Sequence, residues 1–408
     1  MTMVRTKVGR KKRAIPTAAP ALKITDPQVL ELWVKAGGRC ELQGCNDYLL
    51  QDKLTTNKAK LGDVAHIVAR SRGGPRGNDA MPIAERNKIE NLFLACPKHH
   101  REIDTKALVA KYPKELLLHY KQAHEERVRF VTGLSDDHET TIIRLIGRIR
   151  NNSVSISNEE IRDAVLKSSL HYPRYIGSES HIEIDLTSVS ERDLSKYWAD
   201  GCDRIKDVIS RLLVPAIEKH EIKHLSVFAF ARIPFLAYLG QAIGDKVPLE
   251  VFQKHRAGKE AWVWEQNGSA AQFNFNKERT GSDQSCVAVQ LSLSGCVVAD
   301  RLPESIDDRF SIYSILPQGI SPSRDVFLSK NTLENFRAVY ASLLREIESK
   351  HPLAREIHLF PAVPISAAIL LGREMLSGVT PTIVIYDVNK RVFERALLLS
   401  QDHERRNG

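Results

Sequence analysis

The sequence predicts two domains of different fold class: a small α+β domain first, and a larger α/β domain after it. Two patterns separate them. In the first third of the chain, cysteine and histidine residues gather in pairs around a glycine-rich loop. After about residue 165, strand-like apolar runs alternate with helical periodicity, and this alternation occurs twice. Such alternation is typical of parallel sheets covered by helices, so we expect a duplicated α/β unit.

Composition indicates a folded protein and favours a polyanionic partner. The 408 residues are 42% hydrophobic and 27% charged, which is ordinary for two or three folded domains. The net charge of +9 favours nucleic acid as a partner but is also common without one. Six unevenly spaced cysteines and the lack of a signal-peptide pattern predict a cytoplasmic protein without disulfides. Prolines interrupt the two most apolar stretches, 225–244 and 357–372, so no membrane helix is expected.

The elements of the first part follow in order. Residues 1–25 form a basic arm, which we expect to be a flexible, solvated tail rather than a DNA tether. The first domain, residues 26–134, is expected to contain three helices around the turn and the glycine-rich loop. These helices are placed at residues 27–36, 98–110 and 113–132. Apolar residues from Ile142 to Ile149 have a helical period, which predicts a connecting helix within a linker over residues 135–165.

The second domain, residues 166–408, is expected to contain two copies of one α/β unit. Each copy runs helix, strand, helix, strand, and each is preceded by an apolar strand that ends in hydroxyl residues. The elements of the first copy are expected at residues 181–188, 203–220, 224–231, 235–244 and 249–253. Those of the second copy are expected at residues 286–295, 331–351, 356–362, 365–378 and 382–387.

Two pairs of soft metal ligands lie in the first domain. They are Cys40 and Cys45, in a turn, and, much later, Cys96 and His99. Two such pairs fit a closed tetrahedral Zn²⁺ site, so we expect these four residues to bind a structural zinc ion. The alternative is three buried free cysteines and a surface histidine, and the paired spacing in a reducing compartment makes this the weaker interpretation.

Other potential ligands lie beside this first set. His100 and Asp104 are four residues apart on the helix expected from Lys98, so they share a face that His99 does not. Upstream, His66 lies in a short β-rich segment before a glycine-rich turn. A single histidine in such a place is more often structural than catalytic. His100 and Asp104 are therefore available for a second site.

The spacing of these residues follows a recognisable pattern. The pattern consists of His66-Ile67, then Gly73-Gly74, then Asn91-Leu92, and then Cys96 and His100. Over residues 30–110 it resembles the HNH endonuclease family of the ββα-metal fold. The resemblance implies that His66 is the general base, that Asn91 holds the loop, and that His100 binds a catalytic divalent ion, Mg²⁺, Mn²⁺ or Ni²⁺. Phosphodiester hydrolysis needs a base to deprotonate water and a cation to neutralise the charge that develops.

The sequence departs from this family at one position. Many members have an aspartate, a metal ligand, directly before the first histidine, where this chain has Ala65. The nearest acid is Asp63, which an extended strand places on the face of residue 65 but displaced by about 6.6 Å. Asp63 would then reach the metal only through a bulge or a water. Asp104 competes with it as the remaining ligand.

Related motifs recur in the two halves of the second domain. They are HLFPAVPISAAILLG followed by TIVIYD, the degenerate copy VFAFARIPFLAYLG, and AWVWE between the two. Over residues 170–390 they resemble the SAVED domain, a fusion of two CARF-like, Rossmann-like units. This resemblance implies binding of a cyclic oligonucleotide made by a bacterial CD-NTase enzyme.

The order of the two domains adds a further resemblance. An HNH domain followed by a SAVED domain is similar to the effector nucleases of CBASS anti-phage systems. That similarity implies a double-stranded DNA substrate, a cyclic di- or trinucleotide activator, and a homo-oligomer on activation.

Candidate ligand contacts lie mainly at the carboxyl ends of the expected strands. Open α/β sheets bind ligands there, because backbone amides and helix N-termini can face phosphates, and aromatic side chains can stack on bases. The candidates are Ser188, Arg232, Phe235, His255, Arg256, Trp264, Ser292, Ser294, Pro361, Ser366 and Tyr386. Each aromatic among them is more often a core residue than a ligand contact.

Two other functions remain open. A restriction-type HNH endonuclease would have a C-terminal domain that reads DNA through a basic stripe. Residues 281–320 contain few lysine or arginine residues, which disfavours such a stripe. A non-catalytic zinc module that binds DNA would not need His66, Asn91 and His100 together. The leading prediction is therefore an endonuclease gated by a cyclic nucleotide.

Overall fold

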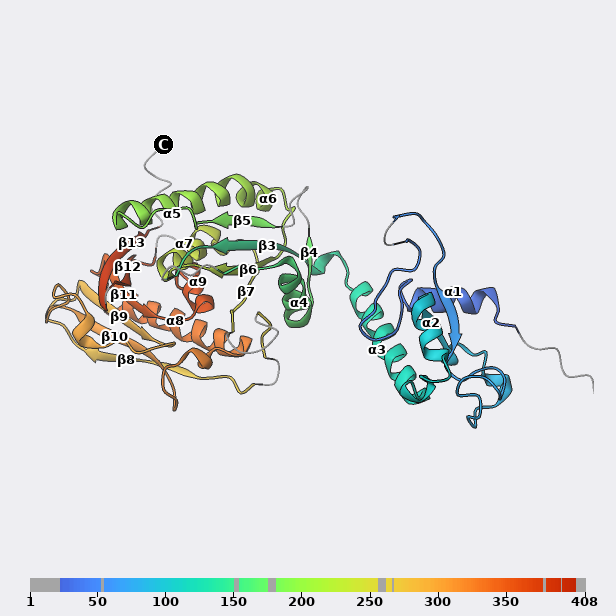
Figure 1. Ribbon diagram of the computed structural model, residues 1–408. Coiled ribbons are helices and arrows are strands. Elements are labelled where there is room, and N and C mark those ends of the chain that lie inside the picture. The colour runs from blue at the N-terminus through green and yellow to red at the C-terminus, as the bar shows by residue number, and fades with distance from the viewer. Residues whose placement is uncertain are drawn as a thin grey trace, which may run out of the picture. The chain divides into compact units, whose positions relative to one another are not determined.

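A computed structural model describes residues 23–52, 55–149, 154–174, 181–255, 262–265, 268–376, 379–389 and 391–400. The chain divides after Gly133 into two compact units (Figure 1), which are taken in turn below. Most of the predicted basic arm, residues 1–22, lies outside the described residues. Within the described ranges, no helix has the length and apolar character needed to cross a membrane.

The first unit contains a two-stranded antiparallel sheet followed directly by a helix. β1 (Asp63–His66) pairs with β2 (Leu92–Ala95) in a regular register, with Asp63 opposite Ala95. α2 (Pro97–Asp104) begins right after β2, because Cys96 is its N-cap and proline is favoured in a first helical turn. The strands and this helix thus succeed one another in the order strand, strand, helix.

Two further helices pack around this sheet. α1 (Asp26–Lys35) begins at Thr25, which forms a reciprocal capping box with Gln28. α3 (Lys114–Thr132) meets the end of α1, where His124 Nε2 donates to the carbonyl of Ala36 at 2.9 Å. The core between these elements includes Leu32, Phe93, Ile103 and Leu117. Three 3₁₀ turns complete the unit: Ile83–Glu85, Ile89–Asn91 and Val109–Lys111.

The second unit begins with a parallel sheet in the order β4-β3-β6-β7, in which β5 also pairs with the end of β3. Its strands are β3 (Glu139–Ile146), β4 (Tyr172–Arg174), β5 (Ile182–Asp185), β6 (Leu225–Phe230) and β7 (Leu249–Val251). Its helices are α4 (Asn158–Ser169), α5 (Leu194–Val208), α6 (Val214–Glu218) and α7 (Ile233–Ile243). A 3₁₀ turn, Asp136–His138, precedes β3, and a π-helical turn, Ile209–Leu213, joins α5 to α6.

The second sheet of this unit has the order β13-β12-β11-β9-β10-β8. Its four inner strands are parallel, and the two edge strands are antiparallel to their neighbours. The strands are β8 (Phe273–Arg279), β9 (Cys286–Ser292), β10 (Ser311–Pro317), β11 (Glu356–Ala362), β12 (Thr382–Asn389) and β13 (Val392–Leu399). The helices are α8 (Lys330–Lys350) and α9 (Ile365–Arg373), with 3₁₀ turns at Ala299–Arg301 and Arg324–Val326.

The two halves of the second unit meet through equivalent helices, α7 and α9 (Figure 1). Gly240 of α7 follows the end of β6 by the same interval by which Gly372 of α9 follows the end of β11. A Cβ on Gly240 would lie 1.9 Å from the carbonyl oxygen of Ile369, and one on Gly372 would lie 1.9 Å from that of Ala237. The glycines therefore let the two helices touch backbone to backbone, in a contact that is symmetric between the two halves.

The structure corrects several predicted elements. The connecting helix predicted from Ile142 to Ile149 is instead β3, and residues 135–165 belong to the second unit. β3 is a central strand that is buried on both faces, so its apolar residues run together, and a short run of this kind does not distinguish strand from helix. The helix predicted at 98–110 ends at Asp104, and the helix predicted at 203–220 begins earlier, at Leu194.

Candidate functional site

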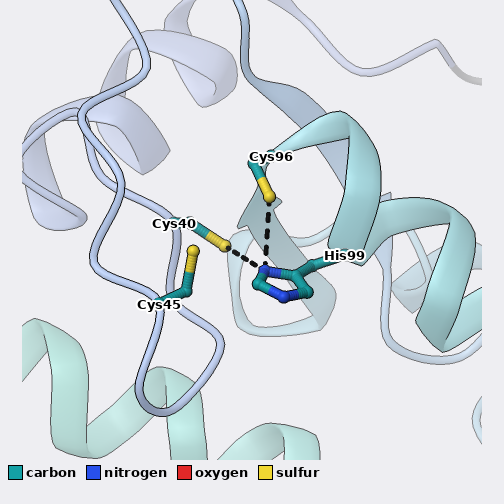
Figure 2. A group of neighbouring side chains, drawn as sticks. All are labelled: Cys40, Cys45, Cys96 and His99. Carbon is teal, nitrogen blue, oxygen red and sulfur yellow. Dashed lines mark hydrogen bonds between the residues drawn. The ribbon is translucent and has the colours of Figure 1, made fainter. Parts of the chain in front are cut away.

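The four predicted zinc ligands form one cluster in the first unit (Figure 2). Cys40 and Cys45 come from the turn after α1, and Cys96 and His99 come from the start of α2. Their ligand atoms all lie within 4.8 Å of one another. His99 Nδ1 lies 3.2 Å from the sulfur of Cys96 and 3.6 Å from that of Cys40. Figure 2 shows all four side chains converging on one point.

Backbone contacts hold the cysteine turn against the sheet. Gly44 has a φ of 84°, in the left-handed region that glycine favours, and the turn closes through a bond from Cys45 N to the carbonyl of Leu42. Glu41, beside Cys40, donates its N–H to Leu94 O and accepts the Leu94 N–H on its carboxylate. Burial raises the pKa of Glu41 to about 8, with Lys121 as the nearest cation. These contacts bring Cys40 close to Cys96.

The electrostatics of the cluster suit a bound cation. Burial raises the pKa of the Cys40 thiol and that of Cys45, because a buried thiolate is costly and hydrogen bonds to the thiols offset only part of that cost. A divalent ion would reverse this effect, since coordinated thiols lose their protons. Three sulfurs and one imidazole nitrogen form a donor set typical of structural zinc.

His100 lies between two carboxylates. Its Nδ1 is 3.1 Å from Asp63 Oδ2, and its Nε2 is 3.5 Å from Asp104 Oδ2. The contact between Asp63 and His100 is direct, and the β1–β2 register has no bulge there. The reason is that Asp63 lies opposite Ala95, at the end of β2 from which α2 starts, so that α2 brings His100 over to it.

Arg76 distinguishes the two carboxylates. Its largely buried guanidinium lies 3.0 Å from Asp104 Oδ1 and also donates to the carbonyl oxygens of Ile67 and Ile103. Asp104 is therefore already paired with a fixed cation, whereas Asp63 is half-exposed at the start of β1. Of the two acids, Asp63 is the better placed to accept an added ion.

His66, at the end of β1, has a partner that sequence reasoning missed. Its Nε2 lies 2.9 Å from the side-chain oxygen of Asn87. An amide oxygen only accepts hydrogen bonds, so Nε2 carries the proton and Nδ1 keeps its lone pair. Asn87 could not be found from spacing, because it lies in the loop between two 3₁₀ turns and matches no predicted motif.

Asn91 is buried and fastens the loop that begins after β1. Its side chain accepts from Val68 N at 2.8 Å and donates to Val68 O at 2.9 Å and to Arg86 O at 2.7 Å. These three bonds use most of its amide capacity and join the two ends of the loop. His66 and Asp63 lie at opposite ends of β1, about 10 Å apart along the strand. Among the described residues, His66 and His100 do not share a cluster as compact as that of the cysteines.

In the second unit, Arg232 faces a cavity of about 350 Å³ at the start of α7. Its Nε donates to Asp387 Oδ2 at 2.6 Å, and its Nη1 lies 3.8 Å from Glu191. The guanidinium also lies over the Trp198 ring, 4.8 Å from the centroid. Arg232 belongs to the first half of the unit and Asp387 to the second, so this ion pair joins the halves beside the cavity.

A second contact of this kind lies at the start of α9. The backbone N–H and the hydroxyl of Ser366 both donate to Gln253 Oε1, at 3.1 and 2.9 Å. Gln253 follows β7, and Asp387 lies near the end of β12. The start of α9 in the second half therefore contacts a strand end of the first half, and the start of α7 in the first half contacts a strand end of the second. The sequence analysis did not select Gln253. Its place after β7, which is comparable to that of Asp387 near the end of β12, is a signal that could have found it.

Several predicted ligand contacts are core residues instead. Phe235 is fully buried against Tyr197 and Trp198, and Trp264 is 3% exposed. Pro361 is buried in β11, and Tyr386 is buried in β12 with its hydroxyl 2.9 Å from His358 Nδ1. The two strands that carry Pro361 and Tyr386 have neighbours on both sides in the sheet, which accounts for the burial of these side chains.

The remaining predicted contacts lie near strand ends. Ser188 accepts from Arg204, and the buried Ser292 hydroxyl accepts from Val297 N. Ser294 is half-buried next to the end of β11, where its N–H donates to Ala362 O. His255 is half-buried and packs edge-on against Trp264, and burial lowers its pKa. Arg256 lies outside the described residues.

Comparison with known proteins identifies a large part of the second unit. Residues 205–399 match the family model of SAVED, the SMODS-associated sensor domain fused to various effectors. This part of the chain is therefore a SAVED domain, as the sequence motifs predict. No curated protein matches the chain significantly.

Two solved structures are similar at low identity. The Cap4 SAVED/CARF-domain containing receptor of Acinetobacter baumannii, solved with the cyclic trinucleotide 3′3′3′-cAAA, has 12% identity and a TM-score of 0.44 over 79% of this chain. The Cap4 receptor of Moraxella osloensis has 12% identity and a TM-score of 0.38 over 80% of this chain. This chain spans 63% and 62% of the length of those two receptors.

Proposed function

We propose that this protein is a metal-dependent DNA endonuclease activated by a cyclic oligonucleotide, and that it acts as an effector of bacterial anti-phage defence of the CBASS type. One observation carries the proposal. A SAVED sensor domain follows a unit in which His66, Asn91 and His100 lie on or beside two paired strands and the helix after them. The sensor domain accounts for regulation, and the first unit accounts for hydrolysis.

His66 is the proposed general base. Its Nε2–H is held by Asn87, so the lone pair on Nδ1 is available to take a proton from the attacking water. Asn87 acts only through His66, because it fixes the ring and its tautomer, and is a positioning residue. Asn91 supports both by holding the loop in place.

His100 and Asp63 are the proposed ligands of the catalytic divalent ion. We assign Asp104 to a different task, because Arg76 already neutralises it: Asp104 orients His100 through Nε2 and leaves Nδ1 and Asp63 for the ion. Imidazole and carboxylate ligands fit Mg²⁺, Mn²⁺ or Ni²⁺. When bound, such an ion neutralises the charge that develops on the phosphate and the leaving 3′ oxygen.

Cys40, Cys45, Cys96 and His99 are proposed to bind a structural Zn²⁺. The donor set and the distances within the cluster support this assignment. The ion would join the turn after α1 to the start of α2, and α2 carries His100. The zinc site would thus stabilise the helix that carries the proposed catalytic-metal ligand His100.

The SAVED unit is proposed to bind the cyclic oligonucleotide at the carboxyl ends of its strands. Arg232 is the strongest candidate for a phosphate contact, because its present partners are carboxylates and a phosphate can replace them in kind. A phosphate that took the place of Asp387 beside Arg232 would break the ion pair between the two halves. Ligand binding is therefore expected to change how the two halves are held together, and so to alter contacts with a second chain.

The test is plasmid cleavage by the purified full chain in Mg²⁺, with and without cyclic di- and trinucleotides that include 3′3′3′-cAAA. We expect cleavage only with a ligand, loss of cleavage in His66→Ala, and normal cleavage in the control His119→Ala, whose ring is exposed on α3. Sequence-specific cleavage without any cyclic nucleotide would favour a restriction-type HNH endonuclease with a C-terminal DNA-reading domain. Ligand binding without cleavage under any condition would overturn the nuclease and keep the sensor.

A further inference from the structure

A second group of possible metal ligands lies in the SAVED-containing unit, far along the sheet from Arg232. It consists of His171, directly before β4, His224, directly before β6, and Glu250 in β7. Their ligand atoms all lie within 4.8 Å of one another. β4, β6 and β7 belong to one parallel sheet, so both histidines lie at its amino edge, opposite the carboxyl edge where α7 begins.

Each of the two imidazoles has a hydrogen-bond partner on Nδ1. His171 Nδ1 lies 2.7 Å from the carbonyl oxygen of Ser169, which can only accept, so its Nε2 keeps a lone pair. His224 Nδ1 lies 2.8 Å from the hydroxyl of Thr140, which itself bonds Ser226. Metal-binding histidines usually have such a partner on the second nitrogen, because it fixes the tautomer and the ring.

The two rings are also in direct contact. They are stacked with centroids 3.9 Å apart and planes 12° apart, an arrangement that two charged imidazoles would oppose. A histidine must be neutral to bind a metal, so this stacked arrangement is compatible with a metal site.

Glu250 supplies the charge of the group. Its side chain is 3% exposed, and neither carboxylate oxygen has a hydrogen-bond partner among the described residues. Lys330 Nζ lies 3.0 Å from Oε1, but it does not have the direction of a hydrogen bond, and its own side chain is 48% exposed. A buried carboxylate needs a firm partner, and a half-exposed lysine is a weak one.

We propose that His171, His224 and Glu250 bind a divalent transition-metal ion of the Zn²⁺ type. Two imidazoles and one carboxylate are a set that zinc takes, with a water or another ligand in the fourth position. Imidazole nitrogens favour zinc, cobalt or nickel over magnesium. Binding at about 2.0–2.1 Å per nitrogen requires the two rings to tilt out of their stack, so that the lone pairs converge. The ion displaces Lys330 from Glu250.

The position of this site indicates a structural or regulatory task. One ion would join β6, β7 and the start of β4, beside the amino end of β3, the first strand of the unit. It lies at the opposite strand ends from the proposed cyclic-oligonucleotide contacts, so neither site needs the other. The inference does not depend on the nuclease activity proposed above.

The first experiment measures zinc per chain in the purified full-length protein after dialysis. The variants are Glu250→Gln, Cys96→Ser and the control His119→Ala. We expect Glu250→Gln to hold one zinc fewer than the wild type, and His119→Ala to hold as many. The Cys96→Ser variant should keep the ion at His171, His224 and Glu250.

Equal zinc in the wild type and in Glu250→Gln, with both folded by circular dichroism, would overturn the proposal. If the wild type holds one zinc, and Glu250→Gln loses it while Cys96→Ser keeps it, the zinc site at the cysteines would be overturned instead.

Cobalt distinguishes the two sites by their spectra. Co²⁺ bound to the cysteine cluster gives a thiolate charge-transfer band, and Co²⁺ bound to imidazoles and a carboxylate does not. In the Cys96→Ser variant we expect visible cobalt absorption without that band, which the further change Glu250→Gln removes. Absorption that persists in the double variant would contradict the assignment.

Lys330→Ala is a second variant, one that keeps all three ligands. If Lys330 competes with a metal, its removal strengthens zinc binding in a Cys96→Ser background, measured as a lower Kd. If Lys330 is instead the true partner of Glu250, its removal lowers the melting temperature and leaves the Kd unchanged or raised. That second result would overturn the proposal.

Discussion

His99 and His100 are adjacent in the chain, but α2 turns their rings toward different partners. His99 Nδ1 lies within 3.6 Å of two sulfurs, whereas both nitrogens of His100 lie near carboxylates. Successive residues on a helix point about 100° apart, so one site cannot easily use both. The two rings can therefore be tested separately.

His99→Ala is expected to lose the bound zinc and to lower the melting temperature, because it opens a closed structural site. His100→Ala is expected to keep zinc and the melting temperature but to lose DNA cleavage. Zinc per chain, thermal unfolding and plasmid cleavage check both variants. One zinc with normal melting in the His99→Ala protein would show that the assignment is wrong.

His66 and Asn87 form a second pair with different tasks. His66→Ala should lower the cleavage rate by roughly 10²–10⁴-fold, the usual contribution of a general base, with fold and ligand binding unchanged. Asn87→Ala should lower kcat less and leave KM unchanged, because it loosens the orientation of the ring and does not remove it. Single-turnover cleavage at saturating DNA measures both. Wild-type cleavage by His66→Ala would remove this residue from the mechanism.

The cluster of cysteines and His99 was predictable because the spacing of these residues in sequence matches their meeting in space. Cys40 and Cys45 close one turn and Cys96 and His99 start one helix, so local geometry alone brings each pair together. Asn87 and Gln253 were not predictable, since each reaches its partner across a loop or between halves. Phe235, predicted as a ligand contact, is fully buried, and sequence does not tell a buried ring from one that faces a ligand.

At the scale of elements, the contact between α7 and α9 holds the SAVED-containing unit together. Gly240→Ala and Gly372→Ala each place a methyl group 1.9 Å from a backbone oxygen of the other helix, which cannot move aside as a side chain could. We expect each to lower the unfolding free energy by about 1–3 kcal/mol, as overpacking does. The gain in helix propensity, about 1 kcal/mol, offsets only part of this.

Chemical denaturation of the full chain measures this effect. Gly295→Ala is the matched control, because its added methyl group would meet no atom within 4 Å and its φ is not in the left-handed region. We expect the control to unfold like the wild type. Equal stability of Gly240→Ala and Gly295→Ala would show that the helices do not touch as closely as described.

The predicted elements of the duplicated units mostly match the observed ones, because their apolar runs are short and bounded by prolines. The strand predicted at 356–362 is β11, and the helix predicted at 331–351 is α8 within a residue at each end. The edge strands β8 and β13 were not predicted. The exposed positions of β8 are polar or charged, and β13 exposes Val392 and Leu398 as well as Glu394 and Arg395, so neither strand has a clear alternation and only pairing with a neighbour makes them strands.

At the scale of the whole molecule, the duplication creates contacts that neither half has alone. Arg232 meets Asp387, and Ser366 meets Gln253, so each half completes a site of the other. Sequence reveals the repeat, but the way in which two copies face one another depends on packing that no single copy encodes. A ligand that inserts phosphates between these contacts would act on both halves together.

The last prediction concerns gating. We expect the protein to be nearly inactive alone and to be switched on by a cyclic oligonucleotide through association of chains, because an unregulated endonuclease would cut the DNA of its own cell. A ligand shifts an equilibrium only by its difference in affinity for the two states, so a change from about 1:99 to 99:1 needs roughly a 10⁴-fold preference. Association would also allow double-strand cleavage, since two one-metal sites would meet opposite strands.

Nuclease activity and sedimentation, each with and without cyclic di- and trinucleotides, test the two parts of this prediction separately. Arg232→Ala should bind the ligand more weakly and need more of it for activation, because it loses a phosphate contact. Its cleavage at saturating ligand should equal that of the wild type, since Arg232 lies outside the first unit. Full activity of a ligand-free monomer would rule out gating. A monomer that the ligand activates would leave gating in place and rule out only association as its cause.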